Sequence, residues 1–246
     1  MFFKQFITAW QFLTIIPISR RIEVTAESLG RSMAVFPLVG LALGGILIAL
    51  DYGFAHIFPP AIVSALLLTS YIAMYGGFHL DGLADTVDGL AGGKDKEHIL
   101  KIMKDSSIGA IGVVALVLVL LVKYQAITSV PDAVRWKGLL VMPVIGRWTQ
   151  VWMTYGSSYA RDSGLGRPFV EYVGKRELLI ACTITIVISW LTLSWRGLVV
   201  IGAAALLGML IKSFFNKKVG GITGDILGAG AELSELLVLV IIIGWM

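Results

Sequence analysis

The chain is dominated by long apolar runs that are separated by short polar segments. Runs of about 18–20 apolar residues are long enough for a helix to cross the hydrocarbon core of a bilayer. Only helices and closed barrels satisfy their backbone hydrogen bonds there. We therefore predict an all-α fold, a polytopic membrane helix bundle with about seven transmembrane helices. The predicted spans are 33–50, 61–80, 108–126, 138–155, 178–194, 198–213 and 225–246.

The N-terminal segment has a different pattern. Its apolar residues recur at helical spacing: Phe3, Phe6, Ile7, Trp10 and Leu13. The strongest charge, at Arg20 and Arg21, follows this apolar stretch, whereas a signal peptide begins with its positive charge. We predict an amphipathic interfacial helix on the cytoplasmic surface within residues 1–32, with an eighth, poorly formed span as the alternative. The whole chain, 1–246, is expected to be a single integral-membrane domain.

Composition agrees with a membrane protein. Of 246 residues, 57% are hydrophobic and only 15% are charged, and the mean hydropathy is +0.86. Soluble domains average about 45–50% apolar and about 25% charged residues. One cysteine excludes an intramolecular disulfide, and the histidines have no zinc-site spacing. No nucleic-acid-binding motif is visible, so the expected macromolecular environment is the lipid bilayer and not DNA or RNA.

The distribution of positive charge predicts the orientation. With the N-terminus inside, most lysines and arginines fall in inner loops, and only a few fall outside: Lys123, Arg135, Lys137 and Arg196. Cytoplasmic loops carry such an excess, so the N-terminus is predicted to be cytoplasmic. The fifth and sixth spans are short and close together, which predicts a tight hairpin or an unusual tilt. Short spans of this kind are also compatible with a homodimer.

Three aspartates follow the second predicted span at four- and three-residue spacing: Asp81, Asp85 and Asp88. Positions i, i+4 and i+7 share one face of a helix. At roughly 6 Å and an effective dielectric near 20, each neighbouring pair of carboxylates repels by about 3 kcal/mol. A divalent cation would remove that cost, and carboxylates with substrate phosphates are typical Mg²⁺ ligands. This pattern favours a cation site over a solvated loop with incidental acids.

Other ionisable residues lie in or near the apolar runs. Asp225 opens the seventh span from the same predicted membrane face as the aspartate run. Glu232 and Glu235 follow inside that span, where acids are functional candidates or pair with Arg147 to hold helices together. Arg147, in the fourth span, either pairs with an acid or clamps a phosphate. His79 is a substrate ligand or an interfacial hydrogen-bonding group.

The stretch from Lys94 to Gly109 is typical of an amphipathic surface helix that ends at the mouth of the third span. Lys104 could neutralise a phosphate, and Asp105 could bind a metal. Arg161 and Arg167, in a glycine-rich loop, either touch an anionic ligand or only satisfy the charge rule for inner loops. The chain has no Ser-His-Asp or Cys-His nucleophile set and no Walker or Rossmann fingerprint.

Three of these stretches, residues 79–89, 102–109 and 220–229, resemble the cobalamin synthase family, also called adenosylcobinamide-GDP ribazoletransferases. The resemblance covers most of the chain, although Ser107 stands where the family commonly has arginine. It implies a Mg²⁺-dependent step late in vitamin B12 synthesis, at the cytoplasmic face of a bacterial inner membrane. The ribose 3′-hydroxyl of α-ribazole, or of its 5′-phosphate, attacks the cobinamide-side phosphorus of adenosylcobinamide-GDP, and GMP leaves.

The resemblance also suggests roles for the candidate residues. Four acids are assigned to Mg²⁺: Asp81, Asp85, Asp88 and Asp225. One of these acids, or Asp105, would accept the hydroxyl proton, and the catalytic residues are predicted to be Asp81, Asp85 and Asp105. Four residues would bind substrate: His79, Lys94, Lys104 and Arg147. Two other classes stay open, an intramembrane prenyltransferase with an aspartate–Mg²⁺ diphosphate site and a cation-coupled transporter that uses the acids as an ion pathway.

Overall fold

The structure, a computed structural model, describes residues 2–18 and 23–245, and this part of the chain is helical with no β-strand. Its elements follow in order: α1 (Phe2–Leu13), α2 (Ala26–Ser32), the 3₁₀ helix η1 (Met33–Val35), α3 (Phe36–Ala55), α4 (Pro60–Tyr75), α5 (Phe78–Gly92), α6 (Lys96–Ile102), α7 (Ala110–Ser129), α8 (Asp132–Thr154), α9 (Arg167–Tyr172), α10 (Lys175–Leu193), α11 (Trp195–Val219) and α12 (Gly224–Ile243). The predicted all-α class is confirmed. Arg20 and Arg21, the charged pair that follows the N-terminal apolar stretch, lie outside the described residues.

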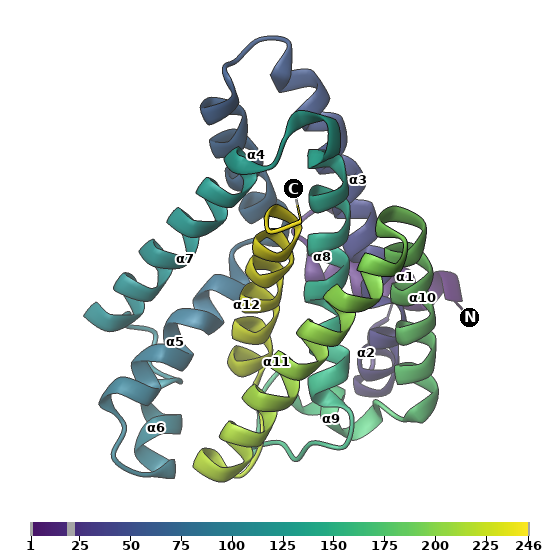
Figure 1. Cartoon of the computed structure of the whole chain (residues 1–246). Helices are drawn as coiled ribbons and strands as arrows, with labels where there is room; N and C mark the ends of the chain where they lie inside the picture. Colours follow the sequence, from purple (N-terminus) through teal and green to yellow (C-terminus); the bar gives the residue numbers. More distant parts are fainter. Residues whose placement is uncertain (1, 19–22, 246) are drawn as a thin grey trace.

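The predicted number of spans is approximately right. Among the described residues, five helical segments are long and apolar enough to cross a bilayer: Ala26–Ala55, α7, α10, α11 and α12. The pair α4 and α5 makes a sixth only when counted together. The predicted span 138–155 corresponds to α8, which has 23 residues and packs between α3 and α12 at the centre of the bundle (Figure 1). Its charged side chains make it less apolar than its neighbours.

The second predicted span, 61–80, is interrupted. α4 ends at Tyr75, and α5 runs at 88° to it. Between them Gly76 and Gly77 have positive φ angles of 68° and 73°, a conformation that glycine adopts at little cost. The apolar run continues to Leu80, so hydropathy alone does not mark this break. We assign α4 to the membrane and α5, which carries the three aspartates, to the edge of the bundle outside the spans (Figure 1).

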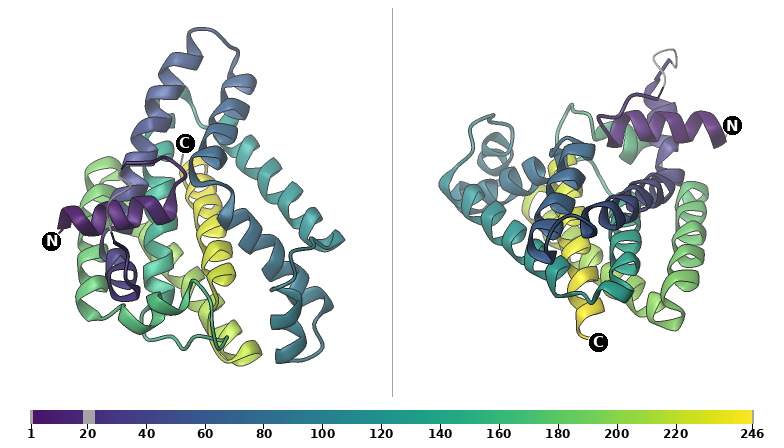
Figure 2. Two further views of the ribbon diagram at one scale, coloured as in Figure 1. Left: turned by 180° about the vertical axis from the view of Figure 1, so that it is seen from behind. Right: turned by 90° about the horizontal axis from the view of Figure 1, so that it is seen from above.

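The N-terminal helix α1 has the predicted amphipathic character. Its 12 residues correspond to about 18 Å of helix, too short to cross a bilayer, so the alternative of an eighth span is wrong. Ile7, Trp10 and Leu13 are buried, whereas Phe2 and Phe3 are exposed. Figure 2 shows α1 lying crosswise to the long helices of the bundle.

The fifth and sixth predicted spans form a tight hairpin. Only Ser194 separates α10 from α11, and it has a positive φ of 56°. α11 is longer than the predicted 198–213, because the helix continues past the apolar run through Lys217 and Lys218 to Val219. The helix therefore projects beyond the apolar part of the bundle at its basic end.

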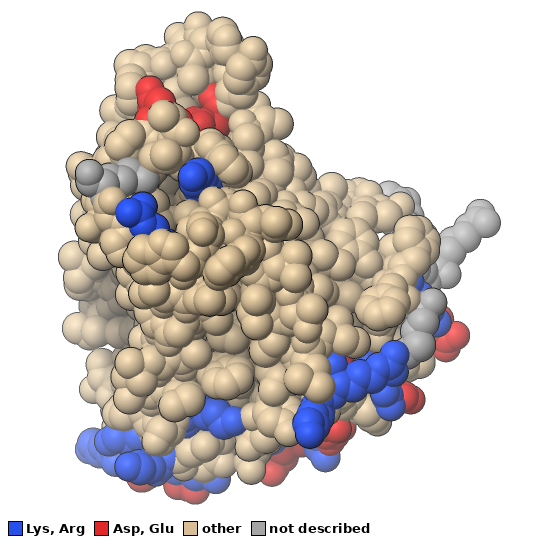
Figure 3. Space-filling view, turned by 45° about the vertical axis from the view of Figure 1, so that its right-hand side comes forward, with Lys and Arg blue, Asp and Glu red and all other residues tan. Residues whose placement is uncertain are grey.

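The predicted inner loops and the predicted outer loops lie at opposite ends of the molecule. At the predicted outer end Arg135 pairs with Asp51 at 3.0 Å, and Arg196 lies 5.8 Å from the Trp245 ring. On the face shown in Figure 3, lysines and arginines are concentrated at the other end, with a broad uncharged surface between. The assignment of Lys123 to the outer loops is wrong, because its side chain is only 1% exposed and lies inside the bundle.

Candidate active site

The aspartate run lies on one helix, as its spacing predicts. Asp81, Asp85 and Asp88 are all in α5, which packs against α12 and α7. Asp81 is exposed and Asp85 is half-buried. Burial, together with the nearby carboxylates of Asp81 and Asp225, raises the pKa of Asp85 to about 7. A cation at this place would offset both the burial cost and the repulsion from the neighbouring carboxylates.

Asp225 lies directly against this helix. A Cβ added at Gly82 of α5 would be 2.8 Å from both the Cα and the carbonyl oxygen of Asp225. A Cβ added at Gly228 of α12 would be 3.1 Å from the Cα of His79. The backbones of α5 and α12 therefore cross in contact at these glycines, and the two acidic stretches meet.

Two loops hold Asp225 beside an arginine. The Asp225 Oδ2 accepts a hydrogen bond from Arg161 Nη2 at 2.7 Å. Arg161 is held there because its loop is joined to the loop before α12: Ala160 N donates to Ile222 O at 3.0 Å, and Ile222 N donates to Ser158 O at 2.9 Å. The sequence shows Arg161 only as one of two arginines in a glycine-rich loop. No sequence pattern reveals its pairing with Asp225.

Asp88 has a structural partner that the sequence analysis did not anticipate. Its Oδ2 accepts a hydrogen bond from Gly109 N, and its Oδ1 accepts one from Gly112 N, both at 2.7 Å. Asp88 thus caps the N-terminus of α7, where a carboxylate also interacts favourably with the helix dipole. Cβ atoms at these glycines would lie 2.5 Å and 2.3 Å from the Asp88 carboxylate, so close approach requires glycine.

The acids do not form a closed metal site in this arrangement. Within residues 2–18 and 23–245, no three His, Cys, Asp or Glu side chains come close enough together to hold a metal ion. The chemistry of the donors nevertheless fits Mg²⁺, which prefers carboxylate oxygens. Within the described part of the chain, Asp88 differs from Asp81, Asp85 and Asp225 in that both of its carboxylate oxygens accept backbone N–H groups. Arg161 is the cation that now neutralises Asp225.

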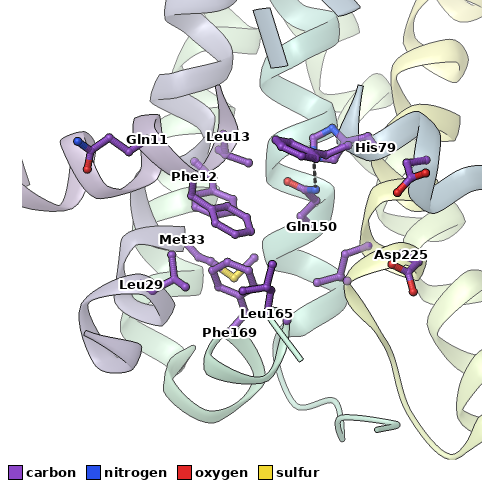
Figure 4. A pocket seen from close by; sticks show the side chains of 16 residues that line it. Gln11, Phe12, Leu13, Leu29, Met33, His79, Gln150, Leu165, Phe169 and Asp225 are labelled. Atoms are coloured by element: carbon purple, nitrogen blue, oxygen red, sulfur yellow. Dashed lines mark hydrogen bonds between the residues drawn. The ribbon is translucent and has the colours of Figure 1, made fainter. Parts of the chain in front are cut away.

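A cavity of about 440 Å³ opens beside these acids. Asp81 and Asp225 lie at one side of it, and side chains of α1, α2, η1, α3 and α9 form an apolar wall: Phe12, Leu13, Leu29, Met33, Phe36 and Phe169. Phe169 packs edge-on against Phe12 and Phe36, with ring centroids at 4.9 Å and 5.7 Å. Figure 4 shows Phe12 and Phe169 facing Gln150 and Asp225 across this space, which we call the apolar cavity.

Two buried polar side chains also line the apolar cavity. Gln150 Nε2 and His79 Nε2 are 2.9 Å apart, and His79 stacks on Tyr75. In this orientation of the Gln150 amide, Nε2 donates to His79 Nε2, and the neutral imidazole then carries its proton on Nδ1. His79 Nδ1 and Gln150 Oε1 have no hydrogen-bond partner in the described part of the chain. The structure thus places His79 at the cavity. Gln150 was missed, although an amide inside an apolar span is a usable signal.

A second cavity, of about 490 Å³, lies next to the first and is basic. Its cationic lining comes from α6, the turn that follows it and the α8–α9 loop: Lys96, Lys101, Lys104 and Arg161. Glu97 and Asp162 are its acidic lining residues. We call this space the basic cavity. It includes Lys104, one of the predicted substrate ligands.

Two predicted site residues lie away from both cavities. Lys94 is exposed and lines neither cavity. Asp105 is also exposed, and its Oδ1 accepts a hydrogen bond from Ser107 N at 2.9 Å, which lowers the pKa of Asp105. Asp105 therefore interacts with its own turn and not with the other acids.

Arg147, one of the predicted substrate ligands, lies inside the bundle with an acidic partner. Its side chain is fully buried, Nη1 donates to Glu235 Oε1 at 3.0 Å, and the guanidinium lies over the rings of Tyr71 and Tyr75. It lines neither cavity. The alternative, that Arg147 pairs with an acid inside the bundle, is correct.

The two glutamates of α12 are part of the same buried network. Lys123 Nζ lies 2.6 Å from Glu232 Oε2 and 2.6 Å from Glu235 Oε2. Tyr75 donates to Glu232 Oε1 at 2.8 Å, and Tyr71 donates to Glu235 Oε1 at 2.6 Å. Two acids thus face two cations, counting Arg147, so the network is neutral and holds α12 against α7 and α8.

The chain is similar to a known family and to several named proteins. The family described as cobalamin-5-phosphate synthase matches residues 5–243. A protein of Geotalea daltonii named adenosylcobinamide-GDP ribazoletransferase is 43% identical over 98% of this chain and 97% of its own length. Proteins of the same name from Acetivibrio thermocellus and Clostridium acetobutylicum are 38% and 37% identical over at least 93% of either chain. No solved structure matches. The chain belongs to the cobalamin-5-phosphate synthase family.

Proposed function

We propose that this chain is an adenosylcobinamide-GDP ribazoletransferase, an enzyme that joins adenosylcobinamide-GDP to α-ribazole or its 5′-phosphate in cobalamin biosynthesis. The names of its relatives support this assignment. The structural observation that carries it is the meeting of the α5 acids with Asp225 beside Arg161, where the apolar and basic cavities adjoin. Family membership favours this transferase over the prenyltransferase and the cation-coupled transporter considered from the sequence.

Three acids are the proposed Mg²⁺ ligands: Asp81, Asp85 and Asp225. Their carboxylate oxygens are the donors that Mg²⁺ prefers, and the metal would neutralise the charge of the substrate diphosphate. Asp88 is left out of this set because both of its oxygens accept backbone N–H groups. Its proposed role is to hold the start of α7 against α5.

The chain's own groups suit the remaining steps of the transfer. Asp81 is exposed and lines the apolar cavity, so it is placed to accept the proton of a ribose hydroxyl that enters from there. The hydroxyl oxygen bonds to the cobinamide-side phosphorus, the bond to the GMP phosphate oxygen breaks, and GMP leaves. Arg161 can hold diphosphate oxygens with two parallel N–H donors. Lys104 adds positive charge on the side of the leaving nucleotide.

The proposed location is a bacterial inner membrane, with the basic end of the bundle in the cytoplasm. The lysines and arginines at this end, several of which line the basic cavity, support that orientation. The cytoplasm would then supply Mg²⁺ and nucleotide substrate to the site. The homodimer stays a prediction.

The test measures the release of GMP by the purified protein in lipid nanodiscs. Adenosylcobinamide-GDP, α-ribazole and Mg²⁺ are supplied in the assay solution. We expect turnover that stops with a chelator and returns when Mg²⁺ is restored. Glu27→Gln, which removes an exposed acid of α2, is the control variant and should turn over normally. A folded protein that releases no GMP under these conditions would contradict the proposed function, and chelator-resistant turnover would contradict the metal assignment.

A further inference from the structure

Two cavities of opposite chemistry share one ion pair. Arg161 lines the basic cavity, Asp225 lines the apolar cavity, and their side chains are 2.7 Å apart. A ligand that reaches through this junction would have its two ends in different environments. A diphosphate joined to a large group on either side is such a ligand.

We propose that the two cavities divide the substrates of the transfer, an inference that rests on the proposed function. The apolar cavity binds the dimethylbenzimidazole end of the acceptor α-ribazole. The basic cavity binds the guanosine phosphate end of adenosylcobinamide-GDP, which leaves as GMP. The diphosphate lies at the junction, beside Arg161.

The lining of the apolar cavity matches the acceptor base. Phe12, Phe36 and Phe169 present aromatic rings, and a dimethylated benzimidazole bonded to ribose has apolar edges and no N–H donor. The volume of about 440 Å³ lies within the range of about 300–1,000 Å³ that small-molecule pockets occupy. The base can fill this space without leaving a donor unpaired.

Unpartnered polar atoms in the same cavity point to a ligand that carries hydroxyl groups. Gln150 and His79 are only 5% and 7% exposed, yet Gln150 Oε1 and His79 Nδ1 have no hydrogen-bond partner in the described part of the chain. A buried group without a partner costs about 1–3 kcal/mol. A ribose can donate to the amide oxygen and accept from the imidazole N–H, so it can satisfy both groups.

The reverse arrangement fits less well. Guanine has several donors and acceptors along its edges, and the apolar wall would leave most of them unpaired. Among the described residues, the lining of the apolar cavity includes no lysine or arginine that could pair with the guanosine phosphates. The basic cavity instead offers Lys96, Lys101 and Lys104 to these phosphates.

The inference is tested by comparing variants of the two cavities in steady-state kinetics. Phe12→Ala shortens the aromatic wall, and Phe12→Leu keeps part of its apolar surface. Lys101→Gln removes one charge of the basic cavity. Phe214→Ala and Lys217→Gln are the matched controls, since both residues are exposed on α11 and line neither cavity.

We expect Phe12→Ala to raise the KM for α-ribazole about tenfold, with a smaller rise for Phe12→Leu and an unchanged KM for adenosylcobinamide-GDP. Lys101→Gln should raise the KM for adenosylcobinamide-GDP several-fold and leave that for α-ribazole unchanged. Equilibrium dialysis gives a readout without turnover: labelled α-ribazole should lose affinity for Phe12→Ala only, and labelled GMP for Lys101→Gln only.

The opposite pairing of variants and ligands would overturn the inference, as would equal effects on both ligands or no effect on either. These failures are distinct from failure of the proposed function. If the unmodified protein turns over but the variants do not separate the two substrates, the division of the cavities is wrong and the transferase stands. If the unmodified protein does not turn over, the transferase itself is wrong.

Discussion

The contact between α5 and α12 at Gly82 makes a sharp prediction. In Gly82→Ala the new Cβ would lie 2.8 Å from two backbone atoms of Asp225, whereas ordinary contacts are 3.4–4 Å. Backbone atoms cannot rotate away as a flexible side chain can, so the helices must separate by about 1 Å. That separation moves Asp225 away from Asp81 and Asp85. A misplacement of about 1 Å can cost about 10²-fold in rate, so we expect GMP release to fall by about two orders of magnitude.

The same variant should also lose stability, because overpacking a tight contact typically costs about 1–3 kcal/mol. Gly45→Ala in α3 is the matched control, since a Cβ there meets nothing within 4 Å. It should keep full activity and gain about 0.5–1 kcal/mol, the difference between alanine and glycine in a helix. The measurements are the rate of GMP release and the thermal unfolding midpoint in detergent. Unchanged turnover by Gly82→Ala would refute the idea that the two acidic stretches act together.

Four further predictions address single residues. Asp81→Asn and Asp85→Asn should abolish GMP release while the protein still inserts in the membrane, and near-normal rates would contradict the metal assignment. Asp88→Asn should lower the free energy of unfolding by about 1–2 kcal/mol in a denaturation experiment, because one of the two caps on α7 is lost; an unchanged value would show that the cap contributes little. Lys123→Met should destabilise the protein by about 3–5 kcal/mol, measured as a lower thermal midpoint or loss of folded protein, because the buried Glu232 loses its lysine partner while Glu235 keeps only Arg147. Lys94→Cys, in a background without the native cysteine, should react with an impermeant thiol reagent only from the cytoplasmic side, and labelling from outside would reverse the topology.

The general architecture could be predicted because it depends on local patterns. Apolar runs of sufficient length predict helices in a bilayer whatever their neighbours are. The spacing of Asp81, Asp85 and Asp88 predicts one helix face for the same reason. Asp225 begins the last apolar run, which predicts that it lies at the same end of the bundle as the three aspartates of α5. The contact between Asp225 and Gly82 agrees with this prediction.

The rest depends on contacts between segments that are distant in sequence. The break at Gly76 and Gly77 is hidden because the apolar run continues beyond it. Lys123 looked like a loop residue because its partners, the two glutamates, are more than a hundred positions away. Arg161 reaches Asp225 only because two loops are joined by backbone hydrogen bonds. No pattern within one segment reveals such pairs.

The neutral network around Lys123 has a consequence for biogenesis. A lysine or arginine at the centre of an inserting helix costs about 2.5–3.5 kcal/mol. Lys123 and Arg147 emerge from the ribosome well before α12, which carries both of their acidic partners. Until α12 is inserted, Lys123 and Arg147 lack these acidic partners, so a chain truncated before α12 should be markedly less stable. We therefore expect the bundle to reach its full stability only after α12 has been inserted.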